Sequence, residues 1–327
     1  MAFVKADRTR TFVRLAFTGP TNSGKTATSI RVAQGIVRKN LIKSGIAEPT
    51  QVQIDEKIAV IDSERGRAKF YANRKEGNFV TGHFFHANLT PPYTVRKYTD
   101  LVLEAAELVG EDGVVIIDSL SHAWAYAGGL LEQKTEMETK RGVNSFTAWN
   151  EAGKMQNDMV DRILSVNAHL IVTLRSKMDY VLEENEKGKM APRQVGLKPV
   201  QRDDLEYEFD VTLMLNKETH HASIIKDTTF LSAKIHEDGT LGMLGEIFGE
   251  ELISWLEEGV DPHELAEEER LTNIQKIQQM CAVNTNLKQY FQNKLFPNRK
   301  STELDLNETR KALTKLYEVQ NLMDIEG

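Results

Sequence analysis

The sequence predicts an α/β protein with a mostly parallel central sheet flanked by helices, followed by a small helical region. Two observations predict the sheet. A glycine-rich motif stands between a strand-like and a helix-like segment, and strand-like and helical segments then alternate along the chain. The pattern after Asp261-Pro262 is helical throughout, and 327 residues suffice for one large domain with an appendage. We therefore expect domains at 1–261 and 262–327.

The glycine-rich motif covers residues 19–26 and matches G-x-x-x-x-G-K-[ST]. Residues 13–18 read as a short buried strand, and residues 25–37 place apolar side chains on one helix face. Glycines let the backbone N–H groups approach phosphates, and the helix N-terminus faces the same charge. We expect Lys25 to reach the outer phosphates of ATP and Thr26 to hold Mg²⁺. The whole nucleotide-binding set is Gly19, Pro20, Thr21, Asn22, Ser23, Gly24, Lys25 and Thr26.

The remaining sheet is expected from apolar, β-branched runs separated by helical patterns. Strands are predicted at 57–62, 78–86, 113–118, 168–174, 210–215 and 228–235, and helices at 93–109 and 149–166. The last two strands lie close together in the chain and favour an antiparallel extension. After residue 262, two apolar stripes predict helices that a break at 291–298 separates: Leu271, Ile274, Ile277, Met280 and Cys281, then Ala312, Leu313, Leu316, Val319 and Leu322.

Two acidic residues at strand ends are candidates for the chemistry of hydrolysis. Asp118 ends the apolar run 114–118 and is the predicted second Mg²⁺ ligand. The next residue is Ser119 rather than a glutamate, so the base that orients water is sought elsewhere. Glu64 follows the run 58–62, whose carboxyl end should meet the same crevice. Glu64 is the predicted general base, against the alternative that it only caps the following helix.

Composition excludes several other classes of protein. One cysteine, Cys281, allows no internal disulfide framework. The sequence has no run of about 18 apolar residues and no secretion signal at its start, which predicts a cytoplasmic protein without a membrane partner. The net charge of −7 argues against general nucleic-acid binding but leaves room for a local basic groove.

A basic segment at 187–202 is the strongest candidate for such a groove. It carries five positive residues and no negative one, while two glycines and two prolines predict an irregular, flexible loop. Residues 128–150 are a second candidate, because Lys134, Lys140 and Arg141 accompany Phe146 and Trp149 there. These aromatics either stack on unpaired bases or pack on the following helix. The DNA-binding candidates are Lys187, Lys189, Arg193, Lys198 and Arg202, and Lys198 or Arg202 has a competing role as a cation that completes a neighbouring subunit's site.

The order of these motifs resembles RecA-like P-loop ATPases, and most closely the phage-encoded ATPases of the Sak-four single-strand annealing type. The resemblance covers residues 10–235 and rests on segments 19–26, 60–66, 114–121, 170–175 and 196–210. It implies a RecA-like P-loop NTPase core whose strand-binding loops would lie at 187–202 and within 128–150, whereas the small C-terminal helical appendage has no clear counterpart in the family. In this family a polar residue, typically glutamine, senses the γ-phosphate where Arg175 stands here, and Arg175 is therefore a catalytic candidate. The alternative for Arg175 is a structural salt bridge.

The function expected from this resemblance is Mg²⁺-dependent ATP hydrolysis, stimulated by DNA, in a homo-oligomeric filament or ring that binds single-stranded DNA. Recombination or strand annealing in a bacterial host cell follows if the protein is phage-encoded. The C-terminal helices are a candidate docking site for a single-strand-binding or replication protein. Two alternatives remain open: a ring helicase or loader of the same fold, and a nucleotide-gated protein-binding module with weak hydrolysis.

Overall fold

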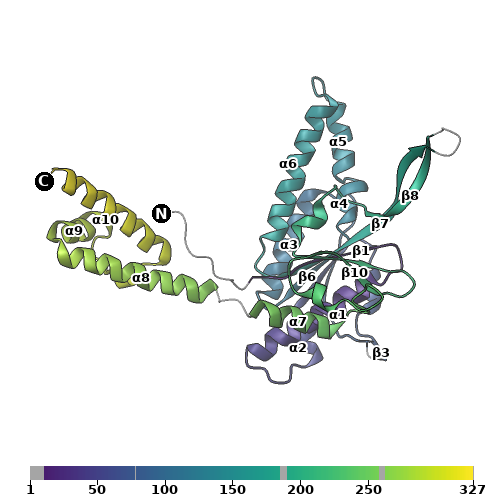
Figure 1. Ribbon diagram of the computed structural model, residues 1–327, viewed down its shortest axis with the longest axis horizontal. Coiled ribbons are helices and arrows are strands. Elements are labelled where there is room, and N and C mark those ends of the chain that lie inside the picture. The colour runs from purple at the N-terminus through teal and green to yellow at the C-terminus, as the bar shows by residue number, and fades with distance from the viewer. Residues whose placement is uncertain (1–10, 78, 185–189, 258–261, 327) are drawn as a thin grey trace. The chain divides into compact units, whose positions relative to one another are not determined.

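The computed structural model describes residues 11–77, 79–184, 190–257 and 262–326 (Figure 1). The chain divides into two compact units, Phe12–Leu256 and a second unit that includes Glu257–Gly327. Within the described ranges, no helix combines the length and the apolar character that crossing a bilayer requires.

The larger unit is built on one mixed sheet with the strand order β10-β9-β1-β7-β6-β2-β5. Neighbouring strands along this path are parallel, except that β10 runs antiparallel to β9. β7 lies between β1 and β6, so one strand separates the glycine-rich motif from Asp118. The strands are β1 (Arg14–Gly19), β2 (Ile58–Asp62), β5 (Phe85–Asn88), β6 (Val114–Asp118), β7 (His169–Glu184), β9 (Val211–Leu215) and β10 (Ala222–Asp227).

Helices cover both faces of this sheet, because the central strands are apolar on both sides. One face packs against α1 (Lys25–Lys43) and α7 (Glu246–Glu257), and the other against α3 (Val95–Val109) and α6 (Ser145–Leu164). The fold class is thus the expected one, an α/β core with a mostly parallel central sheet flanked by helices. Shorter elements complete it: α2 (Gln51–Asp55), α4 (Ser121–Ala125), α5 (Leu130–Glu138), and the 3-10 turns Arg67–Tyr71, Leu205–Glu208 and Leu231–Lys234.

Two glycines allow α1 and α7 to cross at close range. A Cβ on Gly249 would lie 2.2 Å from the carbonyl oxygen of Val32, and one on Gly35 would lie 1.9 Å from that of Glu246. Beside the crossing, Arg31 forms an ion pair with Glu246 at 2.6 Å. Because a glycine of each helix faces the backbone of the other, α7 packs in backbone contact with α1, the helix that follows the glycine-rich motif.

The basic segment forms a regular structure, and the prediction of an irregular loop at 187–202 was wrong for its described part. β8 (Met190–Pro199) pairs antiparallel with the outer half of β7, and the two strands form an arm that extends from the sheet (Figure 1). Proline is tolerated here because an edge strand needs no ladder hydrogen bond on its outer side. Pro192 stands opposite Leu182 in this arm.

Three further sequence predictions were wrong in part. Residues 228–235 contain a 3-10 turn instead of a strand, because the Asp227 carboxylate accepts hydrogen bonds from the Thr229 amide and hydroxyl and turns the chain there. Residues 78–86 hold only β4 (Phe79–Val80) and the start of β5, and β4 pairs with β3 (Lys75–Glu76). Residues 128–150 form α5 and the start of α6, so the expected second loop is a helical hairpin with a short connection.

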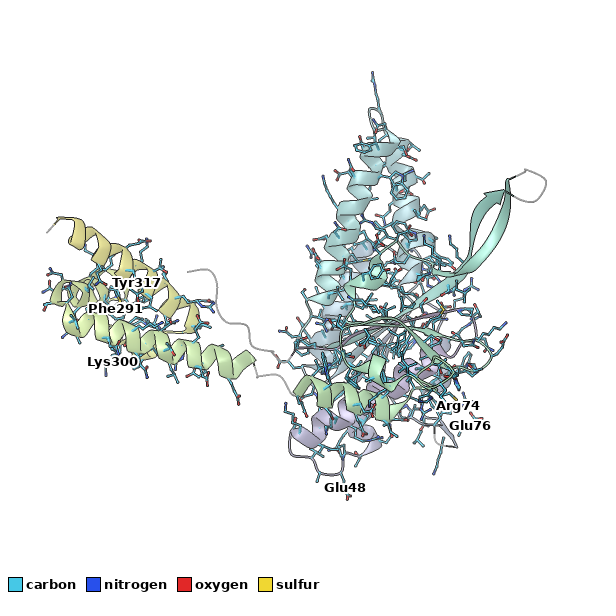
Figure 2. The ribbon with its side chains drawn as sticks, in the orientation of Figure 1. Glu48, Arg74, Glu76, Phe291, Lys300 and Tyr317 are labelled. Carbon is cyan, nitrogen blue, oxygen red and sulfur yellow. The ribbon has the colours of Figure 1, made fainter. Side chains whose placement is uncertain are left out.

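The C-terminal unit is helical. It consists of α8 (Pro262–Val283), α9 (Thr285–Tyr290), a π-helical turn at Phe291–Leu295, a 3-10 turn at Ser301–Glu303 and α10 (Leu306–Glu326). Figure 2 labels Phe291 and Tyr317 in this unit. Phe291 is buried, whereas Leu271 is 47% exposed and does not belong to the core stripe in which the sequence placed it. The buried apolar residues described in this unit are Ile274, Ile277, Leu287, Phe291, Leu304, Ala312, Leu313 and Leu316.

Candidate nucleotide site

The glycine-rich motif forms a tight loop between β1 and α1. Gly19 and Gly24 both have left-handed backbone angles, with φ of 151° and 89°. A Cβ on Gly19 would lie 2.7 Å from both the Leu215 carbonyl oxygen and the Ser23 hydroxyl, so only glycine fits there. Lys25 Nζ donates to the carbonyl oxygens of Gly19 and Pro20, at 2.8 Å each. The ammonium group is thus held next to the loop, where it can replace these hydrogen bonds with hydrogen bonds to phosphate oxygens.

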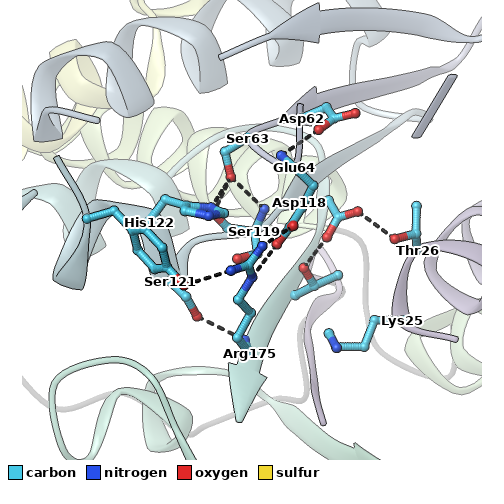
Figure 3. A network of polar contacts seen from close by, with 12 residues as sticks. Lys25, Thr26, Asp62, Ser63, Glu64, Asp118, Ser119, Ser121, His122 and Arg175 are labelled. Atoms are coloured by element: carbon cyan, nitrogen blue, oxygen red, sulfur yellow. Dashed lines mark hydrogen bonds and ion pairs between the residues drawn. The ribbon is translucent and has the colours of Figure 1, made fainter. Parts of the chain in front are cut away.

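Asp118 meets the loop from the end of β6. Its Oδ2 accepts a hydrogen bond from Thr26 at 2.6 Å, and its Oδ1 accepts one from Thr173 at 2.5 Å (Figure 3). Burial raises the pKa of Asp118, although both hydroxyls oppose the shift. A hydroxyl and a carboxylate that converge in this way are the hard oxygen ligands that Mg²⁺ prefers. Thr26 and Asp118 therefore fit the ion that the sequence assigns to them.

Glu64 and Arg175 face each other beside this carboxylate. Arg175 Nε donates to one Glu64 oxygen at 2.5 Å, and Nη2 donates to the other (Figure 3). Arg175 also donates to the Tyr126 hydroxyl at 2.7 Å. Both partners are partly shielded, with side-chain exposures of 13% for Glu64 and 30% for Arg175. The predicted base is thus held by the residue predicted to sense phosphate.

The turn after β2 is stabilised by Asp62 rather than by Glu64. The Asp62 carboxylate accepts hydrogen bonds from the amides of Glu64 at 2.6 Å and Ala68 at 2.8 Å, and it contacts His86 at 3.2 Å. Burial opposes ionisation of Asp62, but the contacts with His86 and the two amides hold its pKa below the usual range. Because Asp62 performs the capping role, the Glu64 side chain is free to face the site.

A buried polar cluster that the sequence did not reveal links the ends of β2 and β6. Ser63 Oγ accepts from the Ser119 amide at 2.9 Å and lies 2.6 Å from His122 Nδ1. Tyr98 donates to the Ser119 carbonyl oxygen at 2.8 Å. Burial lowers the pKa of His122, which keeps its ring neutral near pH 7. The only signal in the sequence was the polar Ser-Glu and Ser-Leu-Ser-His run that follows each apolar strand.

A pocket of about 520 Å³ joins these elements. Phosphate-loop residues, Glu64, Asp118 and Arg175 line one part, and Arg67, Tyr71 and His220 line another. Burial lowers the pKa of Lys25, while the Asp118 and Glu64 carboxylates oppose the shift. The sequence thus predicted residues that meet at one pocket: Gly19 to Thr26, Glu64, Asp118 and Arg175 all lie in or beside it.

Of the DNA-binding candidates, Lys198 and Arg202 have described side chains, and neither lines this pocket. Lys187 and Lys189 fall outside the described residues, and only the backbone of Arg193, in β8, is described. Lys198 forms an ion pair with Asp203 at 2.7 Å, and Arg202 donates to Asn157 of α6 at 2.9 Å. In the second candidate region, Phe146 is 74% exposed, whereas Trp149 packs beside Trp124 and under Lys134.

Comparison with known families decides the class of this site. A family model described as an AAA domain matches residues 11–238, which is well over half of the chain. The chain belongs to the AAA domain family. This AAA domain contains the complete phosphate loop, Glu64, Asp118 and Arg175. The protein is therefore an ATPase of the P-loop class, and nucleotide binding follows from the family.

Other comparisons add little to this assignment. A KaiC-like protein from the hyperthermophilic archaeon Pyrococcus horikoshii OT3 is similar to this chain at a TM-score of 0.33 and 14% sequence identity. The overlap covers 66% of this chain and 81% of that chain. A likeness at this level supports no conclusion about function. No curated protein matches the sequence.

Proposed function

We propose that this AAA domain protein is a Mg²⁺-dependent ATPase that binds single-stranded DNA and supports recombination or strand annealing, as the resemblance to the phage Sak-four type suggests. The observation that carries the proposal is the arm formed by β7 and β8. β7 holds Arg175 at the nucleotide pocket and Thr173 against Asp118, and the same strand continues into the arm, where it pairs with residues 190–199 of the basic segment. A structural change at the phosphate site can therefore be transmitted along one continuous strand to a candidate DNA-binding element.

In the proposed reaction, water attacks the γ-phosphorus of ATP while the bond from that phosphorus to the β,γ-bridging oxygen breaks. Glu64 orients the water and takes its proton, which requires Glu64 to leave Arg175. Arg175 then has a free guanidinium that can contact the γ-phosphate, and Lys25 neutralises the outer phosphates. Bound Mg²⁺, held by Thr26 and Asp118, would neutralise charge that develops on the phosphate oxygens.

DNA binding is tested by fluorescence anisotropy of a labelled oligothymidylate, with ATP and Mg²⁺, with ADP, and without nucleotide. We expect tight binding only with ATP, weakening as salt rises. Pairing of complementary strands without unwinding of a forked duplex would support annealing, whereas unwinding would identify a ring motor. Absence of binding in every nucleotide state would refute the DNA-binding proposal and leave a nucleotide-gated protein-binding module.

We also propose that the protein acts as a homo-oligomer, with Lys198 or Arg202 able to complete a neighbouring site. Arg202 is exposed and donates a hydrogen bond to Asn157 of the same chain, so its guanidinium lies at the surface, where another subunit could bind it. The Arg202→Ala variant separates the two roles of this residue. Lost ATP turnover with normal DNA affinity would mark a trans-acting cation, and lost DNA affinity with normal basal turnover would mark a DNA contact.

A further inference from the structure

A second cavity adjoins the ion pair between Glu64 and Arg175. Its volume is about 450 Å³, and it shares Glu64, Arg67 and Arg175 with the nucleotide pocket but includes no residue of the phosphate loop. The remaining wall comes from the ends of β2 and β5 and from the α4 region, including Arg65, Asn88, Thr90, Tyr93, His122 and Tyr126. The ion pair thus forms part of the boundary between two cavities.

The charge of this second cavity is positive. Arg65 and Arg67 are exposed, and within the ranges that the structure describes neither has an acidic partner at ion-pair distance. Glu64 is the one carboxylate among the described lining residues, and it is already bound by Arg175 at both oxygens. His122 contributes no charge near pH 7, because burial lowers its pKa. Two arginine charges therefore remain uncompensated in a protein whose net charge is −7.

The shape and chemistry of the cavity suit a nucleotide unit of an unpaired strand. Guanidinium groups bind phosphate through two parallel hydrogen bonds. Tyr126 is 37% exposed, and its ring packs on His122 at 4.2 Å between centroids. A supported aromatic ring next to arginines is the combination on which single-stranded nucleic acid stacks a base and places a phosphate. The volume lies in the usual range of ligand pockets, about 300 to 1,000 Å³.

We propose that this cavity binds a phosphate group of single-stranded DNA through Arg65 and Arg67, and that the bound phosphate competes with Glu64 for Arg175. The inference rests on the proposed DNA-binding function and adds the site of contact. The N–H groups of Arg175 that bind both oxygens of Glu64 cannot bind a DNA phosphate at the same time. Occupancy by the strand therefore loosens the hold on Glu64, which becomes free to orient water. DNA binding and ATP turnover would then be coupled through one shared guanidinium.

Arg65→Asn is the most informative variant. Arg65 lines only the second cavity and has a left-handed backbone with φ of 63°, which asparagine accepts more readily than most residues. The substitution thus removes the charge and leaves the turn in place. Arg65→Lys restores the charge, and Lys69→Gln is a matched control, because Lys69 is an exposed cation four positions away that lines neither pocket.

Each variant is assayed for oligothymidylate affinity across a salt series, and for ATP turnover with and without saturating oligothymidylate. For Arg65→Asn we expect about tenfold weaker binding, the effect of one charge-assisted contact. The slope of log affinity against log salt should fall by about 0.7, the value for one phosphate on a single strand. Stimulation of turnover by DNA should be lost while basal turnover is unchanged. Arg65→Lys should recover most of the affinity, and Lys69→Gln should behave as the unaltered protein.

Three outcomes would count against the proposal and can be told apart. Unchanged affinity and salt slope in Arg65→Asn would overturn the contact while leaving the DNA-binding function intact. Failure of the unaltered protein to bind oligothymidylate would remove the proposed function and this inference with it. Stimulation of turnover by inorganic phosphate at matched ionic strength, lost in Arg65→Asn, would show that the cavity takes a free anion and not a strand.

Discussion

The Glu64→Gln substitution tests the central chemical assignment. Glutamine keeps the size of the side chain and one oxygen for Arg175, but it cannot take a proton from water. Loss of a positioned general base lowers turnover by about 100- to 10,000-fold. At about 1.4 kcal/mol for each factor of ten, this corresponds to about 3 to 5 kcal/mol of transition-state stabilisation. ATP affinity should change little, because Glu64 belongs to neither the phosphate loop nor the pair Thr26 and Asp118.

The assay is phosphate release at saturating Mg²⁺ and ATP, with nucleotide affinity measured separately by calorimetry. The folded state should lose only about 1 kcal/mol, because the ion pair is partly exposed and one hydrogen bond survives. Glu107→Gln, an exposed change on α3, is the matched control. Turnover of Glu64→Gln within threefold of the unaltered protein, at normal ATP affinity, would refute the assignment of Glu64 as the base.

Three other predictions concern binding, packing and pH. Lys25→Ala should weaken ATP binding by about 100-fold in calorimetry, since two charge-assisted hydrogen bonds to phosphate are lost; an unchanged affinity would contradict the phosphate-loop assignment. Gly249→Ala should lower the free energy of unfolding by about 1 to 3 kcal/mol in chemical denaturation, because its Cβ meets the Val32 carbonyl oxygen, whereas Gly153→Ala on α6 should raise it by up to about 1 kcal/mol. Asp118→Asn should abolish Mg²⁺-dependent turnover yet raise the melting temperature of the nucleotide-free protein near pH 7. Burial raises the pKa of Asp118 in the folded state, so the wild-type carboxylate costs stability as pH rises above the unfolded value, and the difference should vanish below about pH 4.

The sequence predicted the parts of the site that depend on local chemistry. The phosphate loop follows from its glycines, and the meeting of Glu64 with Asp118 follows from the rule that parallel strands end at one edge. Asp62 and Asp118 are register partners on neighbouring strands, which places the residues after them side by side. The apolar periodicity of the C-terminal segment predicted its helices, which the structure contains. One position of the predicted stripe, Leu271, is nevertheless exposed to solvent.

What the sequence could not predict depends on pairings between distant residues. The bond between Arg175 and Glu64 joins side chains 111 positions apart, and no periodicity reports such a contact. The Ser63 and His122 pair is hidden for the same reason. The β8 strand was missed because prolines were read as breakers, although an edge strand has free positions for them. The roles of the basic residues in DNA binding remain predictions.

The course of β7 has a mechanical consequence. This strand spans 16 residues, which is roughly 50 Å of extended chain. Its first part is clamped between β1 and β6, and the last register partner on β1 is Gly19, opposite Arg175. From Ser176 onward, β8 is the only described strand that pairs with β7, starting with Pro199 opposite Ser176. The change from a strand paired on both sides to a two-stranded arm therefore falls next to Arg175, which binds Glu64. A bend of the arm relative to the sheet would thus act on the backbone of this residue first.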